Sequence, residues 1–340
     1  MLHILNGDAT LALLKQSSVK GTFLVWKDML MEGPVTPAKG TGPGGLDWNA
    51  RAAFMRDTYG IDPKKYLAGM KAFFTAYGKA AKGKEEVVFW FEEDFFCQIH
   101  LVYLLATLPE PLKRKGRAHI ICPEKALGVR LPGAFPKLLA GKLPLEPTLL
   151  TLASKVWKAY ALSSSKGWES LLKWAQSGKG FEPWPLLRSG LRSHLGRLPS
   201  ANGKLNALDT ALLHVLSPGT LPFQQFVRKV WSEPLVRPLG LGDLQVARYA
   251  LDLARRPKPL LLIEGADRDP AKGKPIRSAE WKLHLTSEGR ARLAETIGAQ
   301  AVSPKAVSSK PAKPVKPSKS AVKPAGSVKS VKVAKVARGA

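Results

Sequence analysis

The chain has 340 residues, of which 53 are lysine or arginine and 26 are aspartate or glutamate, so its formal net charge is +27. Apolar residues make up 45% of it, which is enough to fill more than one hydrophobic core and excludes a fully disordered protein. The charge excess favours phosphate-rich partners or an anionic surface, and nucleic acid is the partner that we expect first.

Residues 1–140 predict an α/β domain with a parallel sheet, because short apolar runs alternate with helical patterns. The predicted strands are Leu2–Leu5, Thr22–Lys27, Glu86–Phe91 and Ala118–Cys122. The predicted helices are Thr10–Gln16, Trp48–Tyr59, Tyr66–Lys79 and Phe95–Leu108. The segment Thr36–Leu46 is rich in glycine and proline, which indicates a loop, but it lacks the Lys-Ser/Thr ending of a Walker phosphate-binding loop.

Residues 141–203 predict a helical linker region, with apolar residues at helical spacing in Thr148–Leu162, Lys166–Gln176 and Trp184–Arg197. Residues 204–298 predict a winged-helix-like module of three helices followed by a two-stranded hairpin with a basic loop. The helices are Asn206–Leu216, Pro222–Trp231 and Asp243–Arg255, and the strands are Leu260–Glu264 and Trp281–Thr286. The phrase Leu285–Arg290 resembles the Leu-Thr-x-x-Gly-Arg phrase that follows the wing in winged-helix regulators.

Residues 299–340 predict a disordered tail, because alanine, valine, lysine, proline and serine dominate them and no aromatic side chain is available for burial. The stretch Ala301–Ala340 holds ten lysine or arginine residues and no acid, and its texture is similar to the tails of linker histones. We expect such lysines to bind phosphate without sequence preference, and the candidates are Lys310, Lys313, Lys316 and Lys319. The alternative is a solubilising extension.

Two features predict a cytoplasmic protein that could associate with the nucleoid. The opening Met1–Asp8 reaches a charge too early for a signal peptide, and the longest apolar stretch, Val87–Leu108, is interrupted by polar residues. We therefore expect no membrane partner. The two cysteines, Cys97 and Cys122, offer neither a disulfide framework nor a metal-binding spacing.

A ligand-binding crevice is expected at the carboxyl ends of the strands, near the point where the strand order reverses. If the strand order is 2-1-3-4, Asp8 and Glu92–Asp94 flank the same crevice. The candidate residues there are Asn6, Gly7, Asp8, Asp28, Glu32, Glu93 and Asp94, together with Arg51 and Arg56, which could reach an anionic ligand. The acids could hold Mg²⁺ beside phosphate oxygens or act as a general acid and base. Alternatively, Asp8 caps a helix, Glu92–Asp94 forms a solvated first turn, and the arginines lie on the surface.

The sequence does not decide whether the protein is an enzyme. We find no Gly-x-Ser-x-Gly elbow, no zinc-ligand spacing and no dinucleotide-binding fingerprint, and the cofactor is therefore unknown, with Mg²⁺ as the one that the acids could bind.

The third helix of a winged helix usually enters the major groove of DNA while the wing contacts phosphate. We expect the exposed face of this helix to carry Gln245, Arg248, Arg255 and Arg256, and the loop to offer Lys272, Lys274 and Arg277. Many winged helices contact only protein, so an adaptor role is the alternative.

Four segments resemble the bacterial domain-of-unknown-function 1835 family. The opening His3–Asp8 followed by Val25–Pro34 is similar to the start of that family, and Phe89–Leu105 is similar to its tryptophan and acids before an apolar helix. The phrase Arg197–Leu205 is similar to the family's Arg-Phe-Pro-Ser-x-x-Asn-Gly-Leu phrase, with Leu198 and Lys204 as departures. The resemblance covers about residues 1–295 and implies an α/β N-terminal domain, but it brings no established activity or catalytic residue.

Three functions are consistent with these patterns. The first is a DNA-associated or regulatory protein that binds nucleic acid through its tail and winged-helix-like module and senses a small anionic ligand in the α/β domain. The second is an enzyme or sensor for a phosphorylated or nucleotide ligand at the α/β crevice. The third is a protein–protein adaptor.

Overall fold

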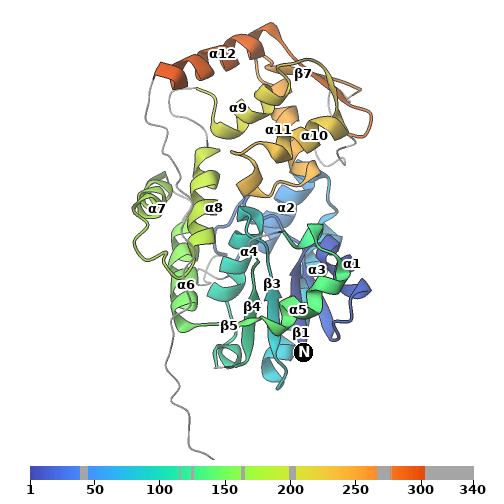
Figure 1. The fold of residues 1–340 in the computed structure, drawn as a ribbon, viewed down its shortest axis with the longest axis vertical. Helices are drawn as coiled ribbons and strands as arrows, with labels where there is room; N and C mark the ends of the chain where they lie inside the picture. The colour runs from blue at the N-terminus through green and yellow to red at the C-terminus, as the bar shows by residue number, and fades with distance from the viewer. Residues whose placement is uncertain are drawn as a thin grey trace, which may run out of the picture.

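The computed structural model describes residues 1–38, 45–114, 116–123, 126–161, 165–198, 204–265, 276 and 278–302. It has an α/β part at one end, a winged-helix-like module at the other, and helices that run along one side and connect them (Figure 1). The predictions made for Lys272, Lys274, Arg277, Lys310, Lys313, Lys316 and Lys319 lie outside the described residues, as does the predicted tail from residue 303 onward. Residues 299–302 were predicted to belong to the tail, but they are the end of a helix, Ser287–Val302.

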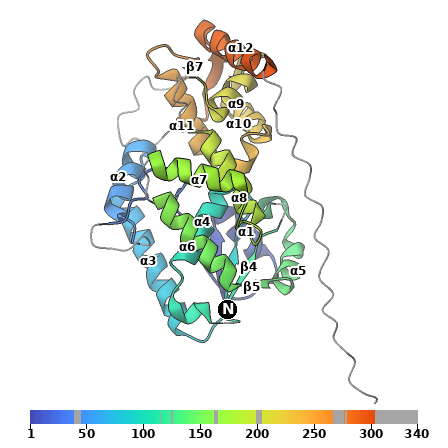
Figure 2. The same ribbon diagram turned by 90° about the vertical axis from the view of Figure 1, so that its left-hand side faces the viewer.

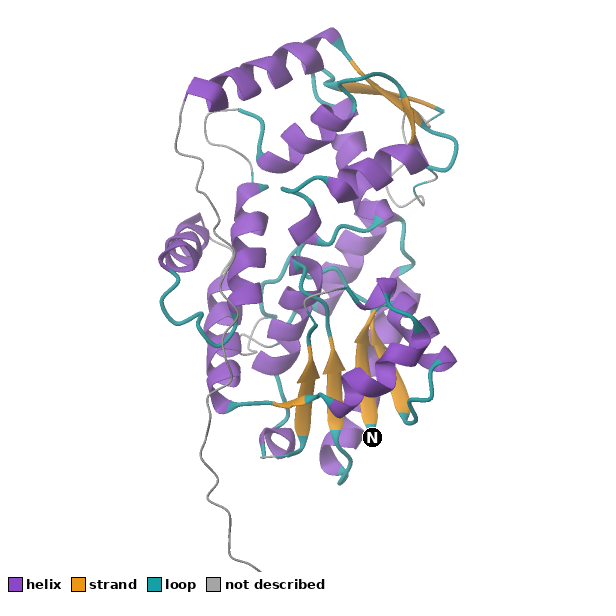
Figure 3. Cartoon of the chain, viewed as in Figure 1, coloured by secondary structure: helices purple, strands orange, loops and turns teal. Residues whose placement is uncertain are grey.

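The α/β part is built on a sheet with the strand order β2-β1-β3-β4-β5 (Figure 3). Strands β1 (Leu2–Asn6), β2 (Thr22–Trp26), β3 (Val87–Trp90) and β4 (Ala118–Ile121) are parallel, and β5 (Leu143–Pro144) pairs antiparallel with β4. The predicted parallel sheet is therefore confirmed, and β1 to β4 stand in the 2-1-3-4 order on which the expected crevice depended. Strand β5 was not predicted, because two residues are too few to show a pattern.

The helices of this part are α1 (Asp8–Gln16), α2 (Trp48–Tyr59), α3 (Pro63–Lys82), α4 (Phe95–Ala106) and α5 (Phe135–Ala140). Three of them begin at an aspartate whose carboxylate accepts backbone N–H groups of the first turn, at Asp47, Asp62 and Asp94. Helix α4 is buried on nearly all sides, because the sheet and the following helices enclose it.

The connecting helices are α6 (Pro147–Ala161), α7 (Ser165–Ser177) and α8 (Pro185–Gly196), and both α6 and α8 pack on α4. The module contains α9 (Ala207–Val215), β6 (Leu221–Pro222), α10 (Phe223–Ser232), α11 (Asp243–Ala254), β7 (Leu261–Glu264), β8 (Lys282–Leu285) and α12 (Ser287–Val302). Its antiparallel sheet has the order β6-β8-β7. The predicted winged-helix-like outline is confirmed, with the two-residue strand β6 as an addition.

One hydrophobic core runs through all three parts, since Phe95 of α4, Trp157 of α6 and Val246 of α11 belong to the same buried cluster. A second cluster, which includes Leu14 and Phe135, lies under α1 and α5, so both faces of the parallel sheet are covered. In the described part of the chain, no helix has the length and apolar character needed to cross a bilayer.

Candidate functional site

The loop after β2 is held by a buried ion pair between Asp28 and Arg51. Arg51 Nε donates to Asp28 Oδ2 at 2.9 Å, Arg51 Nη2 lies 2.5 Å from Asp28 Oδ1, and neither side chain is exposed. Arg51 Nη1 also donates to the backbone oxygens of Glu32 at 3.1 Å and Pro34 at 2.9 Å. Burial alone would lower the pKa of Arg51, but the Asp28 carboxylate raises it above its usual value. The pair therefore fixes the loop, and a ligand would have to displace the loop to reach it.

Glu32, in the same loop, joins the α/β part to the winged-helix-like module. Its Oε1 accepts hydrogen bonds from Gln245 Nε2 at 2.7 Å and from the Tyr249 hydroxyl at 2.6 Å, both on α11. Its Oε2 accepts from the Tyr59 hydroxyl on α2. Burial, with Glu32 beside it, raises the pKa of Tyr59, which keeps that hydroxyl protonated as a donor. Three side-chain donors from two parts of the chain thus converge on one carboxylate.

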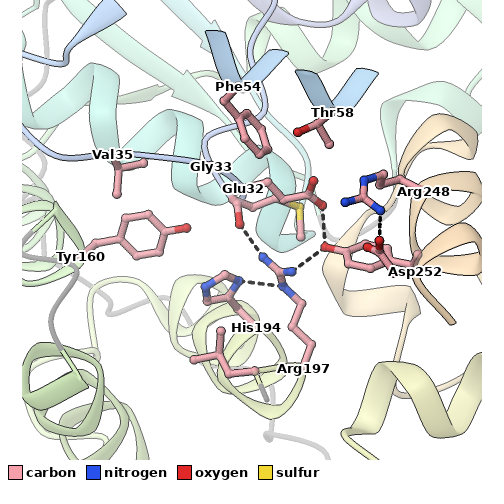
Figure 4. Close-up of a pocket in the computed structure, with 13 residues that line it drawn as sticks. Glu32, Gly33, Val35, Phe54, Thr58, Tyr160, His194, Arg197, Arg248 and Asp252 are labelled. Carbon is pink, nitrogen blue, oxygen red and sulfur yellow. Dashed lines mark hydrogen bonds and ion pairs between the residues drawn. The ribbon is translucent and has the colours of Figure 1, made fainter. Parts of the chain in front are cut away.

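A pocket of about 280 Å³ lies beside Glu32, where all three parts of the chain meet (Figure 4). We call it the junction pocket. Its lining comes from the loop after β2, from α2, α6 and α11, and from the end of α8; the residues are Met31, Glu32, Gly33, Val35, Phe54, Thr58, Tyr160, His194, Arg197, Leu198, Arg248, Tyr249 and Asp252. Polar groups that converge on a small concave space are typical of a ligand site.

Arg197 places a half-buried positive charge in the junction pocket. Its Nε donates to His194 Nδ1 at 3.1 Å, its Nη1 to the Tyr249 hydroxyl at 2.5 Å, and its Nη2 to the Met31 backbone oxygen. These acceptors are neutral, since burial, with Arg197 beside it, lowers the pKa of His194 well below its usual value. None of the ion pairs among the described residues includes Arg197. Because a guanidinium has five N–H groups, one on each terminal nitrogen has no acceptor in the described part of the chain.

Arg248 brings a second guanidinium to the junction pocket from α11. It forms an ion pair with Asp252 one turn further along the helix. Burial lowers the pKa of Arg248, with smaller opposing effects from its neighbours. In Figure 4, Arg197 and Arg248 both extend toward the space beside Glu32.

The third helix of the module does not present the exposed face that the sequence predicted. Gln245 is 2% exposed, and that placement was wrong: its amide oxygen accepts from the Gly242 N–H at 3.1 Å while its nitrogen reaches Glu32. Arg248 is half-buried in the junction pocket. Arg255 is exposed as expected, and Arg256 is half-buried and pairs with Asp209 at 2.6 Å. The α/β part covers the start of α11, a contact that the pattern of one helix cannot indicate.

A second polar group gathers at the carboxyl ends of β1 and β3, as predicted. Asn6 Nδ2 donates to Cys97 Sγ at 2.8 Å, and Asn6 Oδ1 lies 2.9 Å from His100 Nδ1. Gly7 has a φ of +85°, and no described atom lies within 4 Å of the position that a Cβ would occupy. Asp94 caps α4 through the Cys97 N–H at 2.8 Å.

The acids beside this group differ in their hydrogen bonds. Glu92 Oε1 accepts the backbone N–H groups of Leu127 at 2.9 Å and Gly128 at 3.1 Å, whereas Glu93 Oε2 is buried with no hydrogen-bond partner among the described residues. Burial raises the pKa of Asp94 to about 7, against the opposing effect of the Cys97 N–H. Glu92, Glu93 and Asp94 are all half-buried, so the turn at the start of α4 is only partly solvated.

Two of the predicted residues lie apart from both polar groups. Asp8 is exposed and pairs with Lys27 Nζ at 2.8 Å, and it is the first residue of α1 rather than its cap, which is Gly7. The expectation that Asp8 caps this helix was therefore wrong. Arg56 is exposed and pairs with its neighbour Asp57.

Asp94 makes the stability of the protein depend on pH in a direction that can be tested. Its pKa is higher in the folded protein than in the unfolded chain, so its contribution is complete below pH about 4 and is lost as the pH rises through about 7. Between pH 4 and pH 8, we expect the free energy of unfolding of the wild type to fall by up to about 4 kcal/mol more than that of Asp94→Asn, at about 1.4 kcal/mol per pKa unit. Urea unfolding across this range measures the difference. Parallel curves for the two proteins would contradict the assignment.

Among the described residues, no group of three His, Cys, Asp or Glu side chains is arranged to hold a metal ion.

No known family model matches the chain, and no curated protein matches it. The resemblance to the domain-of-unknown-function 1835 family stays a prediction from the residues that carry it.

Proposed function

We propose that this protein is a sensor that binds a small anionic ligand in the junction pocket. The observation that carries the proposal is Arg197, a half-buried cation whose three described acceptors are all neutral. A partly buried charge is costly without a direct ionic partner, and the Glu32 carboxylate reaches Arg197 only through the Tyr249 hydroxyl, so an anion that accepted from Arg197 would remove part of that cost. The remaining N–H groups, one on each terminal nitrogen, suit a carboxylate or a phosphate, which accepts two parallel hydrogen bonds from a guanidinium.

A ligand in this pocket would contact several parts of the chain at once. Arg197 follows α8, Arg248 belongs to α11, and Glu32 to Val35 belong to the loop after β2. Contacts of this kind exist only while α11 stays docked on the α/β part, so the ligand would stabilise the docked arrangement. Ligand binding would thereby control the position of the winged-helix-like module.

Arg197→Gln is expected to abolish stabilisation by the ligand while leaving the fold intact. The wild type is titrated with inorganic phosphate, dicarboxylates and mononucleotides while its unfolding midpoint is recorded. A ligand at about 100 times its Kd adds about 2.7 kcal/mol of stability. Arg192→Gln, at an exposed position of α8, the helix that Arg197 follows, is the matched control and should respond like the wild type. The proposal fails if none of these anions shifts the wild type, or if the Arg197 variant responds equally.

Association with nucleic acid is a second proposal, supported by where the charge lies. Of the 53 lysine and arginine residues, ten lie after Ala301, so 43 remain on the rest of the chain against all 26 acids. A polycation of this kind binds phosphate with an affinity that falls steeply with salt. Fluorescence anisotropy of a labelled duplex between 50 and 200 mM salt tests it, and no binding at about 50 mM would end it. We place this association in the cytoplasm, because Cys97 and Cys122 are both free thiols.

A further inference from the structure

Helix α3 (Pro63–Lys82) carries a continuous row of cations on its outer side. Its inner side packs into the core through Tyr66, Met70, Phe73, Tyr77 and Ala81. We call this outer side, together with Lys84 just beyond the helix, the lysine face of α3. It consists of Lys64, Lys65, Lys71, Lys79, Lys82 and Lys84, all of them exposed. No aspartate or glutamate occurs from Pro63 to Lys84.

The spacing of these lysines suits an extended polyanion. Lys64, Lys71 and Lys82 lie at nearly the same angle around a helix of 3.6 residues per turn, and Lys79 lies beside them. At 1.5 Å per residue, the row from Lys64 to Lys82 is about 27 Å long. None of the ion pairs among the described residues includes a lysine of this face. Each lysine is thus available to pair with a phosphate.

The acids near the two ends of this face are already engaged. Asp62 accepts the N–H groups of the first turn of α3, and Glu85 pairs with the N-terminal ammonium group at 3.4 Å. Arg117 adds a cation at the far end, where its Nη2 donates to the Glu85 backbone oxygen at 3.1 Å. Both acids lie at the ends of the face, and α3 itself carries no acid between them.

Small residues separate the lysines, and this favours nucleic acid over a membrane. The exposed positions between them are Ala68, Gly69, Ala72, Thr75 and Ala76. Helices that bind membranes insert large apolar side chains between the head groups, and α3 turns its large apolar side chains into the core instead. A flat row of lysines and small residues lets a phosphate backbone approach closely.

We propose that the lysine face of α3 is a docking surface for polynucleotides that contacts the phosphate backbone without reading the bases. The inference rests on the nucleic-acid association proposed above and names the surface of the folded part that makes the contact. In Figure 2, α2 and α3 lie together along the left-hand side of the α/β part, with α3 below α2. Helix α11 corresponds to the helix that usually enters the major groove in a winged helix. Here Gln245 and Tyr249 of α11 are hydrogen-bonded to Glu32 of the α/β part instead.

A charge-reversal variant of the full chain tests this surface. Lys71→Glu, Lys79→Glu and Lys82→Glu are combined, and the control combines Lys155→Glu, Lys158→Glu and Lys173→Glu, which are exposed on α6 and α7. Both variants change the net charge equally, and residues 303–340 are the same in each. For a labelled 20-base-pair duplex at about 100 mM salt, we expect at least a tenfold weaker Kd for the α3 variant and less than a threefold change for the control. The salt slope should fall by about 0.9 for each lost contact.

Chemical acetylation of the wild type identifies the lysines directly. Bound duplex should protect Lys71, Lys79 and Lys82 from the reagent and leave Lys155 and Lys158 reactive. If the wild type binds no duplex at about 50 mM salt, both the association and this inference fail. If it binds while the α3 lysines stay reactive and the two variants bind equally, only this inference fails. Protection of the α3 lysines by anionic vesicles but not by duplex would overturn it in favour of a membrane.

Discussion

Asp28→Asn should lower the free energy of unfolding by about 3–5 kcal/mol, because it leaves the Arg51 guanidinium charged and unpaired in the core. Asp8→Asn removes one partner of the exposed pair with Lys27 and should change stability by less than about 1 kcal/mol. The two substitutions are chemically identical and differ only in the burial of the pair. Urea unfolding of both variants beside the wild type measures the contrast.

A double variant separates the charge from the packing. Asp28→Leu with Arg51→Met replaces both partners by apolar groups, and such replacements of buried ion pairs are often neutral or stabilising. We expect it to regain most of the stability that Asp28→Asn loses. The backbone oxygens of Glu32 and Pro34 would still lose their donor, so the recovery should be incomplete. Equal losses for Asp28→Asn and Asp8→Asn would contradict the buried pair.

The second large effect is expected at Glu32, whose removal should release α11 from the α/β part. Glu32→Ala leaves the Tyr59, Gln245 and Tyr249 donors without their acceptor, and each buried unsatisfied donor costs about 1–3 kcal/mol. We expect a loss of several kcal/mol and faster amide hydrogen exchange along α11, while strands β1 and β3 keep their protection.

A conservative variant and a surface control accompany Glu32→Ala. Glu32→Gln keeps one acceptor oxygen and should lose less than Glu32→Ala. Glu110→Ala removes an exposed acid whose partner is Lys113, and it should leave exchange in α11 unchanged. Unaltered exchange in α11 of the Glu32→Ala protein would show that other contacts hold the module.

The sequence predicted most strands and helices because these depend on local patterns. The strand order was only a condition, since pairing between distant strands such as β1 and β3 leaves no local pattern. The runs at β1 to β4 are apolar and short, and the helices that follow β2 and β3 show apolar residues at helical spacing. The strands β5 and β6 were not predicted, because each has only two residues and shows no recognisable pattern.

The candidate site was predicted only in part, because it is assembled from distant segments. Asp28 and Arg51 were both singled out, yet nothing in the sequence indicated that they pair with each other. Glu32 meets Gln245 across 213 positions of the chain, and no local period records such a contact. Arg197 was quoted within the phrase that resembles a known family but was not proposed as a site residue; that phrase is the one signal that could have found it.

The continuous core has a practical consequence for anyone who wishes to isolate the winged-helix-like module. Val246 and Ala247 of α11 are fully buried within the cluster that also holds Phe95 and Trp157. A fragment cut near residue 204 would have to expose part of this shared apolar surface to water, and exposed patches of this kind promote aggregation. The three parts should melt in a single calorimetric transition, and limited proteolysis should release no soluble module.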